Sequence, residues 1–263
     1  MLGSNIRTAF RILFKHRFYT FINLTGLSVG LACCMLIVLY VSHEFHYDRY
    51  HADSGRVYRV VVHAPFYKMQ TIAKTSDLTV PEIKRRFPQV EAAARLYKRS
   101  NLVIRSDENI FYENDVVFTE PEMLRVLTIP VEQGSAESLS QPGQALLTVS
   151  LAQKLFGAGP YSGRTLEING QMIMVAGLVS DPPTQTHLRY QCLVSLASLQ
   201  KQTRQDWTRY DTGSYVKLKS GINRKAFGEQ LATLTESDLP PPPVFRSPFI
   251  ISFKAAGHFF GSA

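Results

Sequence analysis

The sequence contains little cysteine, with three such residues in a chain of 263. Cys33 and Cys34 lie together in an apolar stretch near the N-terminus, so Cys192 is the single cysteine in the rest of the chain. A disulfide framework within that larger part is therefore excluded, and its fold must depend on a hydrophobic core.

Motifs of common catalytic and nucleotide sites are also missing. There is no G-x-x-x-x-G-K-[ST] loop, which excludes ATP binding by this chain in the P-loop manner. The segment from Gly26 to Gly30 reads G-x-S-x-G, but a nucleophile elbow needs a strand-to-helix turn that is open to water. His43 and His46 lack the H-E-x-x-H spacing, and with His51 we interpret them as interfacial side chains rather than metal ligands. We therefore predict no enzymatic activity, and no metal or cofactor bound by this chain.

Positive charge is concentrated at the N-terminus. The formal net charge is +8, and residues 1–17 contribute half of it because they contain four basic residues and no acidic one. Elsewhere no basic stretch alternates with aromatic side chains, so nucleic-acid binding is not indicated. The pattern instead fits the positive-inside rule, which places the N-terminus in the cytoplasm and the larger part of the chain outside.

Charged residues are absent from Phe18 to Val41. As a helix this segment is about 36 Å long, which exceeds the ~30 Å hydrocarbon core of a bilayer. It is also longer than the apolar region of a cleaved signal peptide, and no small-x-small cleavage site follows it. We therefore predict one uncleaved transmembrane helix over residues 18–43.

The basic residues before this helix follow a helical pattern. Arg7, Arg11 and Lys15 recur every four residues beside apolar side chains, and Arg17 adjoins the apolar segment. This spacing predicts a short amphipathic helix within residues 1–17 that anchors the chain at the inner membrane surface. A disordered basic tail is the alternative interpretation.

Small and polar residues share one face of the predicted span. Asn23, Gly26, Gly30 and Cys33 have helical spacing, and Gly26 and Gly30 form a G-x-x-x-G pattern. Small side chains let another helix approach closely, so this face is predicted to pack against partner helices. The alternative is that the glycines only reflect their general frequency in membrane spans.

The remainder of the chain mixes strand and helix signals, which predicts an α+β domain. Asn169-Gly170 between two apolar runs indicates a hairpin. Ser150 is a candidate helix N-cap and Gly157 a candidate helix end, and the proline-rich segment 239–243 is expected to be extended. The main expected strands are 56–64, 101–117 with a turn at 106–109, 145–149 and 213–219, and the expected helices are 81–87, 121–127, 151–156 and 223–234.

Ordered segments over residues 5–220 resemble the MacB/FtsX-like ABC transporter permeases. The segments that carry the resemblance are Asn5-Ile6-Arg7, Leu13–Arg17, Phe21–Gly30, Leu39–Glu44, Tyr47–His51, Arg56–Val60, Arg86–Glu91, Ser150–Gly157, Gly163–Leu166 and Val175–His187.

The resemblance implies a bacterial inner-membrane permease that relays ATP-driven motion to a periplasmic domain for efflux or substrate release. Such permeases are expected to form homodimers and to pair with a separate ABC ATPase subunit that binds ATP. The outer part is expected to be a MacB-like periplasmic core domain, with a porter-like βαβ part and an inserted second lobe. The alternative is a stand-alone single-span protein whose outer domain is a sensor, adaptor or ligand-binding module.

The resemblance also suggests how the chain is divided. We expect a cytoplasmic segment over 1–17, the transmembrane helix over 18–43, the extracytoplasmic domain over 44–250, and a tail over 251–263. In the family three further spans follow the outer domain, so the tail is expected to be truncated before a second span.

Overall fold

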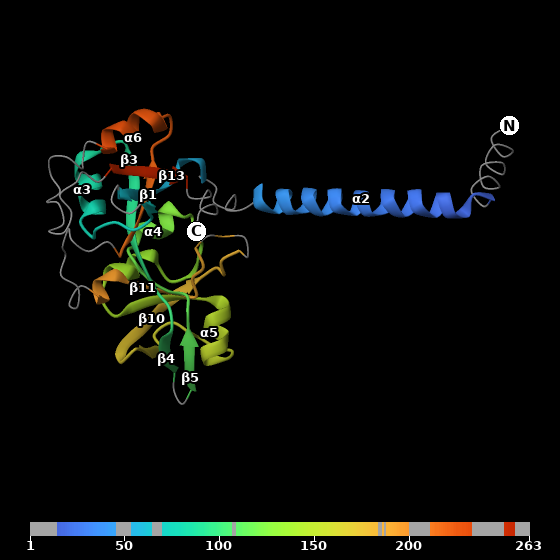
Figure 1. Cartoon of the computed structure of the whole chain (residues 1–263). Helices are drawn as coiled ribbons and strands as arrows, with labels where there is room; N and C mark the ends of the chain where they lie inside the picture. The colour runs from blue at the N-terminus through green and yellow to red at the C-terminus, as the bar shows by residue number, and fades with distance from the viewer. Residues whose placement is uncertain are drawn as a thin grey trace. The chain divides into compact units, whose positions relative to one another are not determined.

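The structure is a computed structural model that shows two separate units, Met1–Tyr47 and Asp48–Ala263. Each unit is described by itself (Figure 1). The residues that it describes are 15–45, 54–64, 70–106, 109–183, 186, 188–199, 211–232 and 250–255.

The first unit contains one long helix, α2 (Arg17–Phe45). Its segment Arg17–Tyr40 has a mean hydropathy of 2.2, and none of that segment is buried. The hydroxyl of Thr25 donates a hydrogen bond to the carbonyl of Phe21 at 2.6 Å, so this polar group is satisfied within the helix. The helix is about 43 Å long, enough to cross a bilayer. The structure thus shows the helix that was predicted over 18–43, with slightly wider bounds.

The second unit is built on one mixed sheet with helices beside it. The strands are β1 (Val57–Ala64), β2 (Gln70–Ile72), β3 (Val90–Arg99), β4 (Leu102–Ser106), β5 (Asn109–Glu113), β6 (Val116–Thr119), β7 (Val131–Gln133), β8 (Gln144–Thr148), β9 (Thr165–Ile168), β10 (Gln171–Val179), β11 (Cys192–Ser195), β12 (Gly213–Leu218) and β13 (Ile250–Ala255). The α-helices are α3 (Thr79–Arg86), α4 (Glu122–Val126), α5 (Val149–Phe156) and α6 (Arg224–Ala232). Short 3-10 turns are η1 (Ser54–Arg56), η2 (Ala136–Ser140) and η3 (Leu196–Ser198).

The strands follow each other in one path through this unit. Their order is β13-β1-β12-β3-β6-β11-β8-β10-β9-β4-β5, with β2 paired to β1 and β7 paired to β10. Two of the pairs, β6–β11 and β8–β10, are parallel, and the other pairs are antiparallel. The predicted α+β class is confirmed.

The porter-like half, residues 54–99 and 212–255, has the split βαβ arrangement. The units β1-α3-β3 and β12-α6-β13 interleave to give the antiparallel order β13-β1-β12-β3. This is the βαββαβ topology of ferredoxin-like folds. Helices α3 and α6 cover one face, where Ile83 and Phe227 pack against Val60 and Val216. The expected porter-like part is therefore present.

The inserted lobe, residues 100–211, leaves the porter-like half after β3 and returns at β12. β3 joins the two parts because it pairs with β12 up to Leu96 and with β6 from Leu96 onward. Within the lobe, Leu151 and Leu155 of α5 pack into a core with side chains from β8, β10 and β11. The expected inserted lobe is therefore also present (Figure 1).

Turn chemistry explains the local boundaries. Asn169 and Gly170 have positive φ angles of 51° and 86° and join β9 to β10 as a two-residue hairpin, as predicted. Gly157, with a φ of 68°, ends α5. The prediction that Ser150 caps this helix was wrong. The helix begins at Val149, and the hydroxyl of Thr148 accepts a hydrogen bond from the Leu151 N–H at 3.2 Å.

The C-terminal strand changes one expected boundary. β13 pairs with β1 from His63↔Ile250 to Tyr58↔Ala255, so the outer domain extends past the boundary expected at residue 250. This strand was not expected from the sequence, in which residues 251–263 were assigned to a tail. The proline-rich segment 239–243 lies outside the described residues.

Candidate functional site

The predicted packing face of the span lies on α2. At 3.6 residues per turn, Asn23, Gly26, Gly30 and Cys33 fall within an arc of about 80°, and all four are exposed. A Cβ atom added at Gly26 or Gly30 would meet no heavy atom within 4 Å. Among the described residues nothing therefore covers this face, and its packing against other helices stays a prediction.

The predicted inner-surface anchor is described only in part. Lys15 and Arg17 are exposed, and the Arg17 guanidinium lies 5.7 Å from the ring centre of Phe18. Arg7 and Arg11 lie outside the described residues, as do His46 and His51. His43 lies in α2, but its side chain is not among those described.

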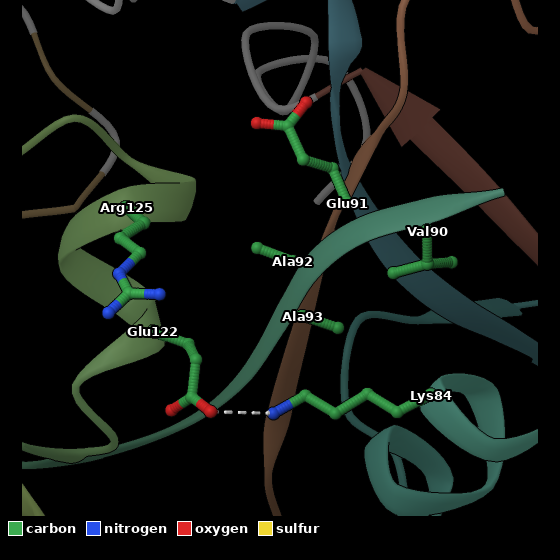
Figure 2. A pocket seen from close by; sticks show the side chains of 7 residues that line it. All are labelled: Lys84, Val90, Glu91, Ala92, Ala93, Glu122 and Arg125. Carbon is green, nitrogen blue, oxygen red and sulfur yellow. Dashed lines mark hydrogen bonds and ion pairs between the residues drawn. The ribbon is translucent and has the colours of Figure 1, made fainter. Parts of the chain in front are cut away.

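The outer domain has a pocket of about 440 Å³ beside β3, which no sequence motif indicated. Figure 2 shows α3 and α4 on either side, with the first residues of β3 between them. The small side chains of Ala92 and Ala93 leave room between the two helices. The lining residues are Lys84, Val90, Glu91, Ala92, Ala93, Glu122 and Arg125.

The two helices cover opposite faces of β3 because neighbouring side chains of a strand point to opposite sides. Ala93 packs in the core beside Ile83 of α3. Ala94 packs in the core beside Met123 and Leu124 of α4. α4 belongs to the inserted lobe in sequence, but it covers the porter-like sheet, so this pocket lies where the two parts of the domain meet.

The first half of β3 is a sheet edge. Over residues 90–95 the described part of the chain pairs β3 only with β12, since β6 begins to pair at Leu96. At Arg95 side chains take the place of a neighbouring strand. Glu120 accepts a hydrogen bond from the Arg95 N–H at 3.1 Å, and the Thr119 hydroxyl donates one to the Arg95 carbonyl at 2.7 Å.

Glu120 also holds the side chain of the same residue. Its Oε1 accepts a hydrogen bond from Arg95 Nε at 3.2 Å, and the Arg95 side chain is only 8% exposed. The guanidinium donates a further hydrogen bond to the carbonyl of Asp77, which precedes α3. One buried cation thus ties together β3, the segment before α4 and the segment before α3.

A second ion pair crosses the pocket. Lys84 Nζ of α3 lies 3.2 Å from Glu122 Oε1 of α4, and Figure 2 shows the two side chains extending toward each other. Burial raises the pKa of Glu122, but its own backbone N–H and the charge of Lys84 outweigh burial. The pKa of Glu122 therefore lies below its usual value, and its carboxyl group is ionised at neutral pH.

The remaining charges of the pocket also have partners. Glu91 Oε2 lies 2.6 Å from Arg56, and Glu91 Oε1 lies 3.2 Å from Lys217. Burial raises the pKa of Glu91, but hydrogen bonds from Lys217 and Arg56 outweigh it, so that pKa is lowered. Arg125 pairs with the exposed carboxylate of Glu137 at 2.7 Å. The charges that line the pocket thus pair with one another or with neighbouring side chains, and the pair Lys84–Glu122 joins α3 to α4.

The described residues were searched for metal-binding groups and for a reactive cysteine. They contain no group of three or more His, Cys, Asp or Glu side chains that could hold a metal ion. Cys192 is fully buried, and burial raises the pKa of its thiol well above the usual range, which makes it unreactive.

The fold is that of known permease domains. The family model of the MacB-like periplasmic core domain matches residues 20–234. No curated protein matches the sequence. Three solved structures are similar to this chain at the level of the fold, all at low sequence identity.

A domain of a protein described as a permease from Porphyromonas gingivalis is 20% identical, with a TM-score of 0.68, covering 79% of this chain and 92% of that one. The periplasmic region of MacB from Actinobacillus actinomycetemcomitans is 13% identical, with a TM-score of 0.58, covering 75% and 88%. The extracellular domain of the noncanonic ABC-type transporter YknZ from Gram-positive bacteria is 17% identical, with a TM-score of 0.52, covering 68% and 91%.

Proposed function

Because this chain belongs to the MacB-like periplasmic core domain family, we propose that it is the membrane-spanning permease subunit of a MacB/FtsX-type ABC transporter. It is a membrane protein with an extracytoplasmic domain. The observation that carries the proposal is that one family model runs without a break from within α2 through the outer domain.

In this proposal the N-terminus lies in the cytoplasm and the outer domain lies in the periplasm, beyond the bacterial inner membrane. The basic residues before α2 support this orientation. A separate ABC ATPase binds and hydrolyses ATP, whereas this chain binds no cofactor and catalyses no reaction itself. The motion of the ATPase passes along α2 to the outer domain and drives efflux or substrate release.

The junction between the two parts of the outer domain suits such a relay. Arg95–Glu120 and Lys84–Glu122 connect the porter-like half to the inserted segment at two points. Because of these two ion pairs, a movement of the porter-like half would also move the inserted lobe. The open face around Gly26 and Gly30 would pack against other permease helices, from a second copy or from further spans.

Co-purification from native membranes tests the proposal. The full chain is cross-linked, isolated and examined by mass spectrometry, and we expect an ATPase with a P-loop to be recovered with it. Gly26→Leu and Gly30→Leu should lower the recovery of partner subunits because the added side chains keep a second helix away.

Ser28→Leu is the matched control, since it adds the same side chain on the opposite face of α2 and should leave recovery unchanged. A chain that is stable alone, without an ATPase and insensitive to both glycine substitutions, would contradict the proposal. That result would instead support a single-span sensor, adaptor or ligand-binding protein.

A further inference from the structure

β5 is an uncovered edge of the large sheet. Among the described residues it pairs only with β4, and it lies at the margin of the inserted lobe (Figure 1). Its sequence contains no proline, glycine or lysine, the residues with which natural proteins commonly prevent pairing at an edge. The strand is nevertheless anchored, because Phe111 packs against the core and Lys154 Nζ lies 5.2 Å from its ring centre.

The outward face of β5 is apolar and exposed. Ile110 is 57% exposed and Tyr112 is 75% exposed, although both are large hydrophobic side chains. The strand registers continue the Ile110 row across the sheet through Arg105 and Glu167 to Met172, which is 61% exposed. Arg105 and Glu167 lie 3.6 Å apart and so satisfy each other. The apolar surface therefore reaches the free edge without an unpaired charge from this row.

The backbone of β5 also offers unused hydrogen-bonding groups. Ser106 pairs with Asn109 across two intervening residues, so this closing pair exchanges hydrogen bonds and the next pair does not. Ile110 and Tyr112 consequently direct their N–H and C=O groups away from β4. A row of alternating donors and acceptors of this kind is matched by another extended strand.

We propose that β5 pairs in antiparallel orientation with β5 of a second copy of this chain. With the two-fold axis at Phe111, Ile110 of each copy faces Tyr112 of the other, and Asn109 faces Glu113. β-Branched and aromatic residues are favourable cross-strand neighbours, and no like charges face each other. The same register pairs the outward N–H and C=O groups of Ile110 with those of Tyr112 of the second copy.

This self-complementarity is the reason to identify the occupant as a second copy. A two-fold interface brings the same patch of both copies together, and the pattern of β5 satisfies that requirement. The contact is small compared with a stable soluble dimer interface. Copies that are anchored in one membrane meet at a much higher effective concentration, so a small contact is sufficient there. The β5 interface requires neither an ATPase nor the glycine face of α2. A result that excludes the β5 pairing would therefore not contradict the proposed function.

Cysteine cross-linking in the membrane tests the register. Two differently tagged full-length chains, one carrying Ile110→Cys and the other Tyr112→Cys, are co-expressed in a Cys33→Ala, Cys34→Ala background. The two new cysteines face each other with Cα atoms about 5.5 Å apart, within disulfide range. We expect oxidation to join the two tags, whereas either variant alone gives little covalent dimer because like positions are offset by two residues along the strand.

Met172→Cys paired with Met174→Cys provides the matched control, since both positions are exposed in the same lobe but lie away from the edge. Limited proteolysis confirms that each variant keeps its fold.

Three results would overturn the proposal. Equal cross-linking by the mixed pair and by either single variant would show random collision rather than one register. No cross-link between the tags, while a small maleimide labels both cysteines, would show an edge that no second copy occupies. A disulfide from Ile110→Cys to an unrelated protein would assign the edge to a foreign strand and would equally overturn the pairing of two copies.

Discussion

The first half of β3 and the strand β5 both lie at edges of the sheet among the described residues, and the two edges differ in what covers them. The first half of β3 is covered: α3 and α4 lie on opposite faces, Lys84–Glu122 spans the pocket, and Glu120 occupies the Arg95 N–H. β5 has none of these protections and presents Ile110 and Tyr112 to solvent. The difference indicates which edge serves contacts within the domain and which is available to another molecule.

The residue types follow the same division. At the β3 edge, small alanines lie beside charged side chains that pair with one another, a composition that discourages strand addition. At the β5 edge, the exposed side chains of Ile110 and Tyr112 flank Phe111, which anchors the strand to the core. One edge of the sheet thus makes contacts within the domain, whereas another edge is open to contacts with a second molecule.

The largest expected effect comes from breaking the covered edge at Glu120. Glu120→Gln leaves the Arg95 cation without its charge partner in a site where it is almost entirely buried. Because one member of a nearly buried pair is lost, we expect the free energy of unfolding to fall by about 3 kcal/mol. Chemical denaturation of the full chain in detergent, followed by circular dichroism, measures the change.

Glu137→Gln is the control, since the Arg125–Glu137 pair is highly exposed and should contribute no more than about 0.5 kcal/mol. Equal, small effects of the two substitutions would show that Glu120 does not stabilise the junction.

An intermediate effect is expected from the two faces of β5. Phe111→Ala removes the side chain that anchors the strand to the core, and we expect a loss of about 1–2 kcal/mol because that side chain is only partly buried. Tyr112→Ala, one residue away on the exposed face, should change the free energy of unfolding by less than about 0.5 kcal/mol. The same denaturation experiment compares them, in a monomeric sample at low protein concentration. A larger loss for Tyr112→Ala would mean that the outward face is packed against something within the chain.

The smallest effect concerns acidification of the Lys84–Glu122 pair. The pKa of Glu122 is lowered in the folded protein, so its stabilising contribution is present above the unfolded value of about 4.3. That contribution is lost as the pH falls through the lower, folded pKa. Below about pH 4.3 we expect faster amide hydrogen exchange at residues 90–93, after correction for the intrinsic exchange rate.

Glu122→Gln should show part of this faster exchange already at pH 7, because the glutamine carries no charge to attract Lys84. The peptide that contains β5 serves as the internal reference and should change little. Unaltered exchange at residues 90–93 in the variant would show that the ion pair does not cover this edge.

Much of the fold could be predicted from local sequence signals. The β-branched run that forms β1, the Asn169-Gly170 hairpin and the helix that ends at Gly157 all follow from residue preferences that tertiary structure did not override. β3 could not be predicted in this way. Its central residues Ala92, Ala93 and Ala94 favour a helix, and they adopt a strand because β12 pairs with them and helices cover both faces.

The junction was beyond prediction for a different reason. Arg95 and Glu120 are 25 residues apart, and Lys84 and Glu122 are 38 apart. Neither spacing belongs to a recurring motif, so only the folded topology brings these charges together. The β5 edge could be predicted only in part. The turn at 106–109 was expected from the sequence, but which strand lies at an edge depends on the order of strands in the whole sheet.

The entry and exit of the inserted lobe have a consequence for its evolution. Leu96 on β3 and Gly213 on β12 are direct neighbours in the ladder, so the lobe begins and ends at almost the same place. A long segment held at one such point can be lengthened, shortened or exchanged without altering the βαββαβ connectivity beneath it. α4 is the exception, because its Met123 and Leu124 cover the porter-like sheet. Relatives that differ in the outer lobe are therefore expected to keep a helix of this kind, together with the carboxylate before it that pairs with Arg95.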